Sequence, residues 1–190
     1  TTEIYTLSLH DALPISLSIA NKAVFNYCNF SGCDTGFIGN AGDKADHGVQ
    51  FNDCYFEKNR IGIDYILIGS LCINQCYFES NAEHEIYIHS SRLSGNAKGL
   101  LILEKSFILH RFNESYNSAI KQEVPSNITI LYVINNNYIR QYSSYGGHFI
   151  NVISGNLTIE ARNNFIMGIP YSICSTTPSA TYYFNNDFSE

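Results

Sequence analysis

The sequence predicts an all-β protein, a parallel β-helix of about seven coils. Two observations carry this prediction. A short motif recurs along the chain of 190 residues, and the segments between its copies contain Gly, Asn, Ser and β-branched or aromatic residues. Such segments form short strands and turns, whereas leucine-rich and helical repeats of similar period need helix-forming stretches. Three short strands make one coil, and stacking of the coils creates the core.

The first residues are considered separately from the repeat. Thr6–Ile15 reads TLSLHDALPI, which resembles the in-frame translation of a sequencing-adapter oligonucleotide. We therefore expect residues 1–16 to be a non-native, adapter-derived segment and residues 17–190 to form a single β-helix domain, a fragment of a longer protein. For the same reason His10 and Asp11 are not treated as catalytic residues.

The motif reads apolar-Asn-x-Cys-Tyr-Phe-Glu in its clearest copies, which start at Phe51 and Ile73. Its fourth position is occupied along the chain by Cys28, Cys54, Cys76, Ser106, Asn137, Asn164 and Asp187. Successive members of this column are 26, 22, 30, 31, 27 and 23 residues apart. A period of this length is typical of a solenoid, with one copy of the motif in each coil.

The alternation of side chains along a strand places the fourth and sixth motif positions on one face. The sixth position is apolar in six copies: Phe30, Phe56, Phe78, Ile108, Ile139 and Ile166. Both positions are therefore expected to point inward. Beside a turn, Cys acts as a small hydrophobe and Asn can hydrogen-bond the next coil. All the cysteines, including Cys33, Cys72 and Cys174, are expected to be reduced thiols.

Composition excludes several classes of function. The chain has 17 acidic and 11 basic residues and a net charge of −6, which argues against a nucleic-acid surface. No apolar run has the length needed for insertion into a membrane. Zinc spacings of Cys and His are absent, and Asp34, Asp43 and Asp46 lack the spacing of a calcium loop. We therefore expect neither a metal nor another cofactor.

The segments Asn52–Asn59 and Asn74–Asn81 resemble the right-handed parallel β-helix repeats of the pectin-lyase-like superfamily. Within it they are most similar to bacteriophage tailspikes, tail appendages and secreted bacterial polysaccharide enzymes, and the resemblance extends from Asn21 to the end of the chain. It implies a polysaccharide partner, a place in a virion tail or outside the cell, and a homotrimer. The family's galacturonase and lyase signatures are absent, and Asp46-His47-Gly48 is the nearest fragment.

The fifth motif position faces outward and is aromatic. It contains Tyr55, Tyr77, Phe107, Tyr138, Phe165 and Phe188. With coils about 4.8 Å apart, such a stripe could stack on a polysaccharide, and Tyr55, Tyr77, Phe107 and Tyr138 are the candidate substrate-binding residues. In the alternative interpretation the rings only stack on one another.

Carboxylates on neighbouring coils could form the acid pair of a glycosidase. Glu57 and Glu79 share the seventh motif position, one coil apart, and Asp64 and Glu85 follow in the next strand. A separation of about 5–5.5 Å would suit a retaining mechanism. In the alternative interpretation these residues form a solvated acidic face.

Two histidines lie in the segment HEIYIH, at His84 and His89. Their odd spacing puts them on opposite faces of a strand, which argues against a shared metal site. His89 is a candidate substrate contact or general base. The functional hypotheses are therefore the β-helix body of a tailspike-like or secreted polysaccharide depolymerase, acting by hydrolysis or elimination, a binding module without catalysis, or a structural stalk.

Overall fold

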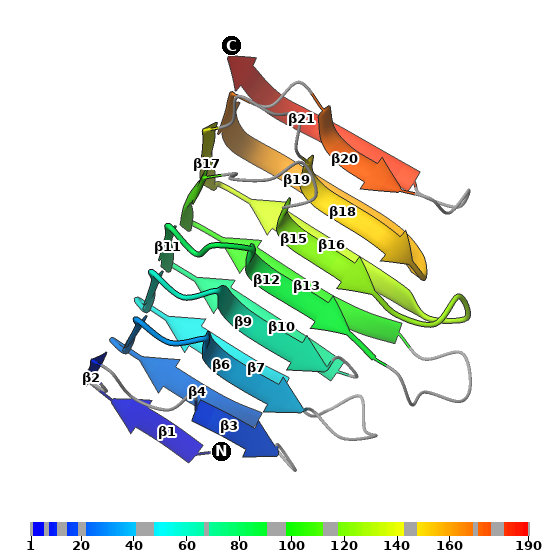
Figure 1. Ribbon diagram of the computed structural model, residues 1–190. Helices are drawn as coiled ribbons and strands as arrows, with labels where there is room; N and C mark the ends of the chain where they lie inside the picture. Colours follow the sequence, from blue (N-terminus) through cyan, green and yellow to red (C-terminus); the bar gives the residue numbers. More distant parts are fainter. Residues whose placement is uncertain are drawn as a thin grey trace.

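The structure is a computed structural model in which every described strand pair is parallel and successive coils stack along one axis (Figure 1). Side chains are described for residues 22–39, 48–66, 69–90, 98–111, 118–140, 148–168 and 186. For 2–5, 8–10, 15–18, 40, 141–142, 171–175, 181–185 and 187–189 only the strand backbone is described. No segment of the described chain forms an apolar helix with the length needed to cross a bilayer.

Each coil contributes one strand to each of three faces. We call the first face the first row: β1 (Thr2–Tyr5), β4 (Lys22–Asn26), β7 (Gly48–Asn52), β10 (Gly69–Asn74), β13 (Lys98–Glu104) and β16 (Thr129–Asn135). The second row contains β2 (Ser8–His10), β5 (Asn29–Ser31), β8 (Tyr55–Glu57), β11 (Tyr77–Glu79), β14 (Phe107–Arg111) and β17 (Tyr138–Tyr142). The long strand β19 (Asn156–Met167) extends both rows and joins them into one sheet, and β21 (Thr181–Ser189) pairs with it.

The third face is a separate seven-stranded sheet, with one strand after another in chain order. Its strands are β3 (Ile15–Ser18), β6 (Thr35–Asn40), β9 (Ile61–Ile66), β12 (His84–His89), β15 (Ser118–Glu123), β18 (His148–Ser154) and β20 (Tyr171–Ser175). Figure 1 shows the long first-row strands and this sheet on either side of the axis. Their inward side chains fill the space between the faces.

Four successive coils are regular. The coils β4–β6, β7–β9, β10–β12 and β13–β15 pair with one another without a shift in register. Beyond them the register shifts between Gln122 and Glu123, where β15 meets β18, and β19 runs through a corner as one strand. The fold class predicted from the sequence is confirmed. The regular solenoid, however, comprises about four coils rather than the seven counted from the motif.

The corner between the first and second rows explains the motif. Its turn residues have φ between 51° and 57°: Tyr27, Asp53, Gln75, Lys105, Asn136 and Asn163. This left-handed conformation costs about 1–2 kcal/mol per residue. The amide of Tyr27 offsets part of that cost by donating to the Asn52 carbonyl one coil away, at 3.0 Å, and Asp53 and Gln75 repeat the bond.

The two inward columns lie where the sequence places them. The sixth-position rings Phe30, Phe56 and Phe78 are fully buried and stack with centroids 4.7 and 4.9 Å apart. The described cysteines are free thiols, and Cys28, Cys54 and Cys76 are buried at the corner. Cys33 is also buried, but Cys72 is only half-buried. The side chain of Cys174 lies outside the described residues.

Asparagine continues this corner column as a hydrogen-bonded ladder. The Asn137 Oδ1 accepts from the Ser106 amide at 2.8 Å, and its Nδ2 donates to the Leu103 carbonyl at 2.9 Å. Asn164 repeats the arrangement, with its Oδ1 accepting from the Asn137 amide at 2.9 Å. Asn186, not Asp187, comes next and accepts from the Asn164 amide at 3.1 Å. The last motif copy is therefore shifted by one residue.

Strands β1, β2 and β3 pair in parallel with β4, β5 and β6. Strands β1 and β2 lie within residues 1–16, the segment expected to be adapter-derived, and β3 crosses its end. Strand pairing is insensitive to the origin of a sequence, so the assignment of residues 1–16 and the division at residue 17 stay predictions.

Candidate functional site

The outward aromatic column of the second row exists and forms one continuous stack. Centroids of successive rings are 5.7 Å apart for Tyr55–Tyr77, 5.2 Å for Tyr77–Phe107, 4.5 Å for Phe107–Tyr138 and 5.3 Å for Tyr138–Phe165. The last three pairs are within 18° of parallel. Each of these rings therefore covers the face of its neighbour and presents an edge to solvent. Tyr55, at one end, is 53% exposed and keeps one face accessible.

Glu57 and Glu79 are brought together by the register. They are direct partners on β8 and β11 and lie beside the aromatic stack. The Tyr77 hydroxyl donates to Glu79 Oε2 at 3.1 Å, and Lys58 Nζ lies 3.7 Å from Glu57 Oε2. Burial raises the pKa of Tyr77, and the Glu79 hydrogen bond and the charges of both carboxylates raise it further. The two carboxylates therefore lie around one neutral hydroxyl group.

Asp64 and Glu85 do not form a pair. Glu85 lies in the interior and is fully buried, whereas Asp64 is on the outer face of the seven-stranded sheet. The Glu85 carboxylate contacts His110 Nδ1 at 2.8 Å and accepts from Asn81 Nδ2. Burial raises the pKa of Glu85, and the His110 contact opposes this shift.

The buried position of Glu85 follows from a break in side-chain alternation at the start of β12, where His84, Glu85 and Ile86 are all buried. Gly62 lies opposite on β9, and a Cβ there would lie 2.6 Å from the Glu85 carbonyl oxygen. The neighbouring strands approach this closely only because residue 62 has no side chain.

The outer face of β9, β12 and β15 contains a connected cluster of polar side chains, which we call the outer cluster: Asp64, Tyr87, His89, Lys121 and Glu123. His89 Nε2 lies 2.7 Å from Asp64 Oδ1, and the Tyr87 hydroxyl donates to Glu123 Oε2 at 2.9 Å. The His89 and Tyr87 rings stack with centroids 4.8 Å apart. Lys121 Nζ lies 4.9 Å from the Tyr87 ring centre and 3.6 Å from Glu123 Oε2.

The outer cluster is held in place and still accessible. The side chains of Asp64 and His89 are 21% and 30% exposed, and those of Lys121 and Glu123 are 27% and 48% exposed. Burial raises the pKa of Tyr87, with further contributions from the Glu123 hydrogen bond and from the charges of Glu123 and Asp64. Tyr87 therefore remains a neutral hydrogen-bond donor at physiological pH.

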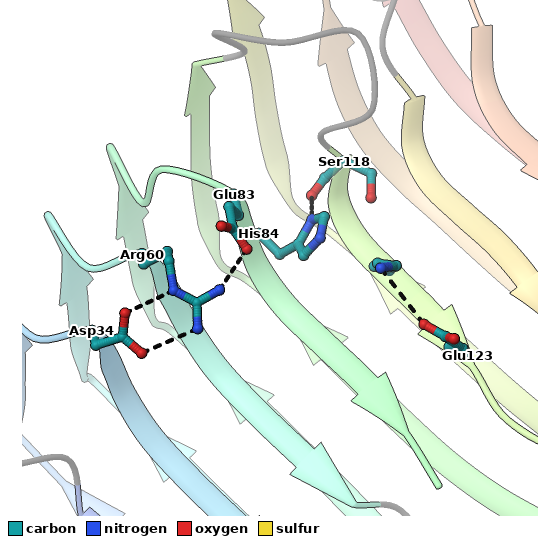
Figure 2. A network of polar contacts seen from close by, with 7 residues as sticks. Asp34, Arg60, Glu83, His84, Ser118 and Glu123 are labelled. Atoms are coloured by element: carbon teal, nitrogen blue, oxygen red, sulfur yellow. Dashed lines mark hydrogen bonds and ion pairs between the residues drawn. The ribbon is translucent and has the colours of Figure 1, made fainter. Parts of the chain in front are cut away.

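An ion-pair ladder lies at the corner between β8 and β9 (Figure 2). The Arg60 guanidinium binds Asp34 through two bonds of 2.7 and 3.1 Å and Glu83 through one of 2.6 Å. The hydrogen bond from Arg60 lowers the pKa of Asp34. Of the three aspartates considered for Ca²⁺, Asp34 is thus engaged, and Asp43 and Asp46 lie outside the described residues. The described residues contain no group of three that could hold a metal ion.

The odd spacing of His84 and His89 predicts opposite faces of β12, and this is wrong. Alternation breaks at Glu85, so the His84 ring lies 5.8 Å from the outward Tyr87 ring, which stacks on His89. Figure 2 shows the His84 ring turned toward the carbonyl of Ser118, which lies 2.9 Å from its Nδ1. Burial lowers the pKa of His84 to about 4, so this ring is neutral and structural. His89 lies in the outer cluster.

Sequence reasoning named Asp64 and His89 but missed Tyr87, Lys121 and Glu123. Register makes Tyr87 the partner of both Asp64 and Lys121, and His89 the partner of Glu123. These positions follow the motif at intervals that change with each insertion. A coil-by-coil alignment of β9, β12 and β15 is the signal that could have found them. Comparisons with protein-family models, with curated proteins and with solved structures found no match.

Proposed function

We propose that the protein binds a polysaccharide through the outer cluster on the seven-stranded sheet. The observation that carries this proposal is the pairing of Asp64 with His89 and of Tyr87 with Glu123 around one stacked pair of rings. Sugar hydroxyl groups both donate and accept hydrogen bonds. Carboxylates that accept, a hydroxyl and an ammonium that donate, and a ring edge that packs on C–H groups are complementary to them.

The shape of the solenoid supports a polymeric rather than a small ligand. The cluster extends over three coils along the axis, and neighbouring coils continue the same surface. We infer that the chain is the β-helix body of a tailspike-like protein or of a secreted polysaccharide depolymerase, found in a virion tail or outside the cell. The resemblance of its motif to those repeats supports this inference.

The test is binding of the folded chain to a panel of bacterial capsular and pectic polysaccharides, measured by titration calorimetry. Tyr87→Phe keeps the ring and removes the hydroxyl that donates to Glu123. We expect it to weaken binding about tenfold, the effect of one good hydrogen bond. Tyr27→Phe is the matched control, because Tyr27 is 64% exposed at the opposite corner of the coil. Equal affinities of the two variants, or no binding by folded protein, would contradict the proposal.

Glu57 and Glu79 support a second function, retaining hydrolysis of a glycan that lies along the second row. Their strands are direct neighbours, about 4.8 Å apart, and retaining enzymes hold their carboxyl groups about 5–5.5 Å apart. We expect new reducing ends without ultraviolet absorbance, and a loss of at least about 100-fold in Glu57→Gln and Glu79→Gln. Reducing ends with absorbance would indicate elimination instead. No cleavage by a chain that binds would leave recognition as its function.

A further inference from the structure

The outward face of β13 and β16 has an apolar centre. Leu100 and Ile102 point outward from β13 and are half-buried, as are their register partners Leu131 and Val133 on β16. Leu100 and Leu131 also line a shallow hollow of about 370 Å³ beside Ser70. Half-buried aliphatic side chains on the outside of a sheet gain stability when another surface covers them.

Opposite charges flank this apolar centre on the same strand. Lys98 is at the start of β13 and Glu104 is at its end, both pointing outward, about 20 Å apart. Within the described part of the chain, neither side chain takes part in an ion pair. From the described residues, the Glu104 carboxylate accepts one hydrogen bond, of 3.3 Å, from Asn135 Nδ2.

The charges are symmetric about the centre of the strand. Leu101 is the middle residue of β13, with Lys98 three positions before it and Glu104 three positions after it. A half-turn about a line parallel to the solenoid axis, lying outside the face and level with Leu101, reverses the strand direction and turns the two outward faces toward each other. It therefore brings the lysine end of one copy against the glutamate end of another, with Leu100 and Ile102 at the centre.

We infer that β13 and β16 form the interface of a two-fold dimer of this chain. The surface is self-complementary, which is what an isologous interface requires. Two Lys98–Glu104 pairs would flank an apolar centre, so that charges orient the copies and apolar contacts hold them. The described outer surfaces of the other two faces of the solenoid are less suited to this, because one carries the aromatic stack and the other the outer cluster. The inference is independent of the proposed glycan binding.

Sedimentation velocity of the full chain over a range of concentrations tests the inference. We expect a dimer whose dissociation constant rises with salt. Lys98→Glu and Glu104→Lys should each raise the dissociation constant at least about tenfold, because each places two like-charged pairs in the interface. The double variant K98E/E104K should restore dimerisation. Lys58→Glu makes the same change in charge at a side chain that is 73% exposed on another corner, and it should have no effect.

The sharpest test mixes the two single variants. One carries two glutamates at the ends of β13 and the other two lysines, so they should associate with each other although neither self-associates. Circular dichroism establishes that both are folded. A monomeric wild type, a trimer, or single variants that fail to form the mixed dimer would each overturn the inference.

Discussion

Two outward columns of the solenoid differ in how their side chains are partnered. In the second row the same kind of side chain recurs in every coil from Tyr55 to Phe165, and each ring contacts the next. On the seven-stranded sheet, consecutive coils place Asp64, Tyr87 and Lys121 in one column. In the uniform column each ring is partnered by the ring of the next coil, and this fixes the stacking of the coils. The varied column presents different polar groups side by side, and a ligand can compete for them.

Removing one side chain from the inward asparagine ladder should have the largest effect on stability. Asn137→Ala leaves the buried Ser106 amide and the Leu103 carbonyl without their side-chain partner. We expect a loss of about 3–5 kcal/mol in the free energy of unfolding, measured by urea titration. Asn137→Ser should lose about half of that, because Ser106 makes the equivalent bond to the Cys76 amide in the neighbouring coil. Equal losses in both variants would contradict this assignment.

The pH dependence of stability should show the next largest effect. Burial lowers the pKa of His84 to about 4 in the folded chain, against 6.5 for an unperturbed histidine side chain. A base with a lowered pKa is neutral in the fold, so its contribution is complete above pH 6.5 and is lost as the pH falls toward 4. The expected loss is about 2–3 kcal/mol.

Asn is the matched replacement for His84, because its Nδ2 can donate to the Ser118 carbonyl and cannot titrate in this range. Unfolding by urea at several pH values between 4 and 7 compares wild type with His84→Asn. The other ionisable groups are present in both proteins, so the difference between the two profiles reports on His84. Parallel stability profiles for the two proteins would show that His84 is not responsible.

The comparison between the two outward columns is sharpened by one substitution in each. Phe107→Leu removes two ring stacks, with Tyr77 and with Tyr138, and should cost about 1–2 kcal/mol of stability. It should leave polysaccharide affinity unchanged. Tyr87→Phe should weaken polysaccharide binding and leave stability unchanged. If Phe107→Leu weakened binding as much as Tyr87→Phe, the aromatic column would be part of the glycan site.

The sequence predicts those features that repeat with the coil. The inward columns at Cys54, Phe56 and Asn137 and the outward ring at Tyr77 all occupy fixed positions in the motif. Alternation along a strand and stacking of coils are sufficient to place them. Alternation and stacking also predict that Glu57 lies beside Glu79.

The remaining features depend on departures from simple alternation or from equal coils. Glu85 is buried because alternation fails at the start of β12, as it also does at the start of β9 and β15, so an argument from alternation alone misplaces it. The contact between His89 and Asp64 is diagonal across two strands, so it depends on side-chain orientation as well as register. Asn186 replaces Asp187 in the asparagine ladder because the last coil is offset by one residue. The structure is needed wherever coils are unequal.

The smallest effect is expected at the corner ladder of Asp34, Arg60 and Glu83. Arg60→Gln removes three hydrogen bonds between charged groups, but all three side chains are at least 42% exposed. Solvent-exposed ion pairs contribute little and are screened by salt. We expect the stability difference from wild type to be barely measurable by urea titration at low salt and to vanish in 1 M salt. A large difference that persists in high salt would mean that Arg60 also holds the corner through packing of its aliphatic stem.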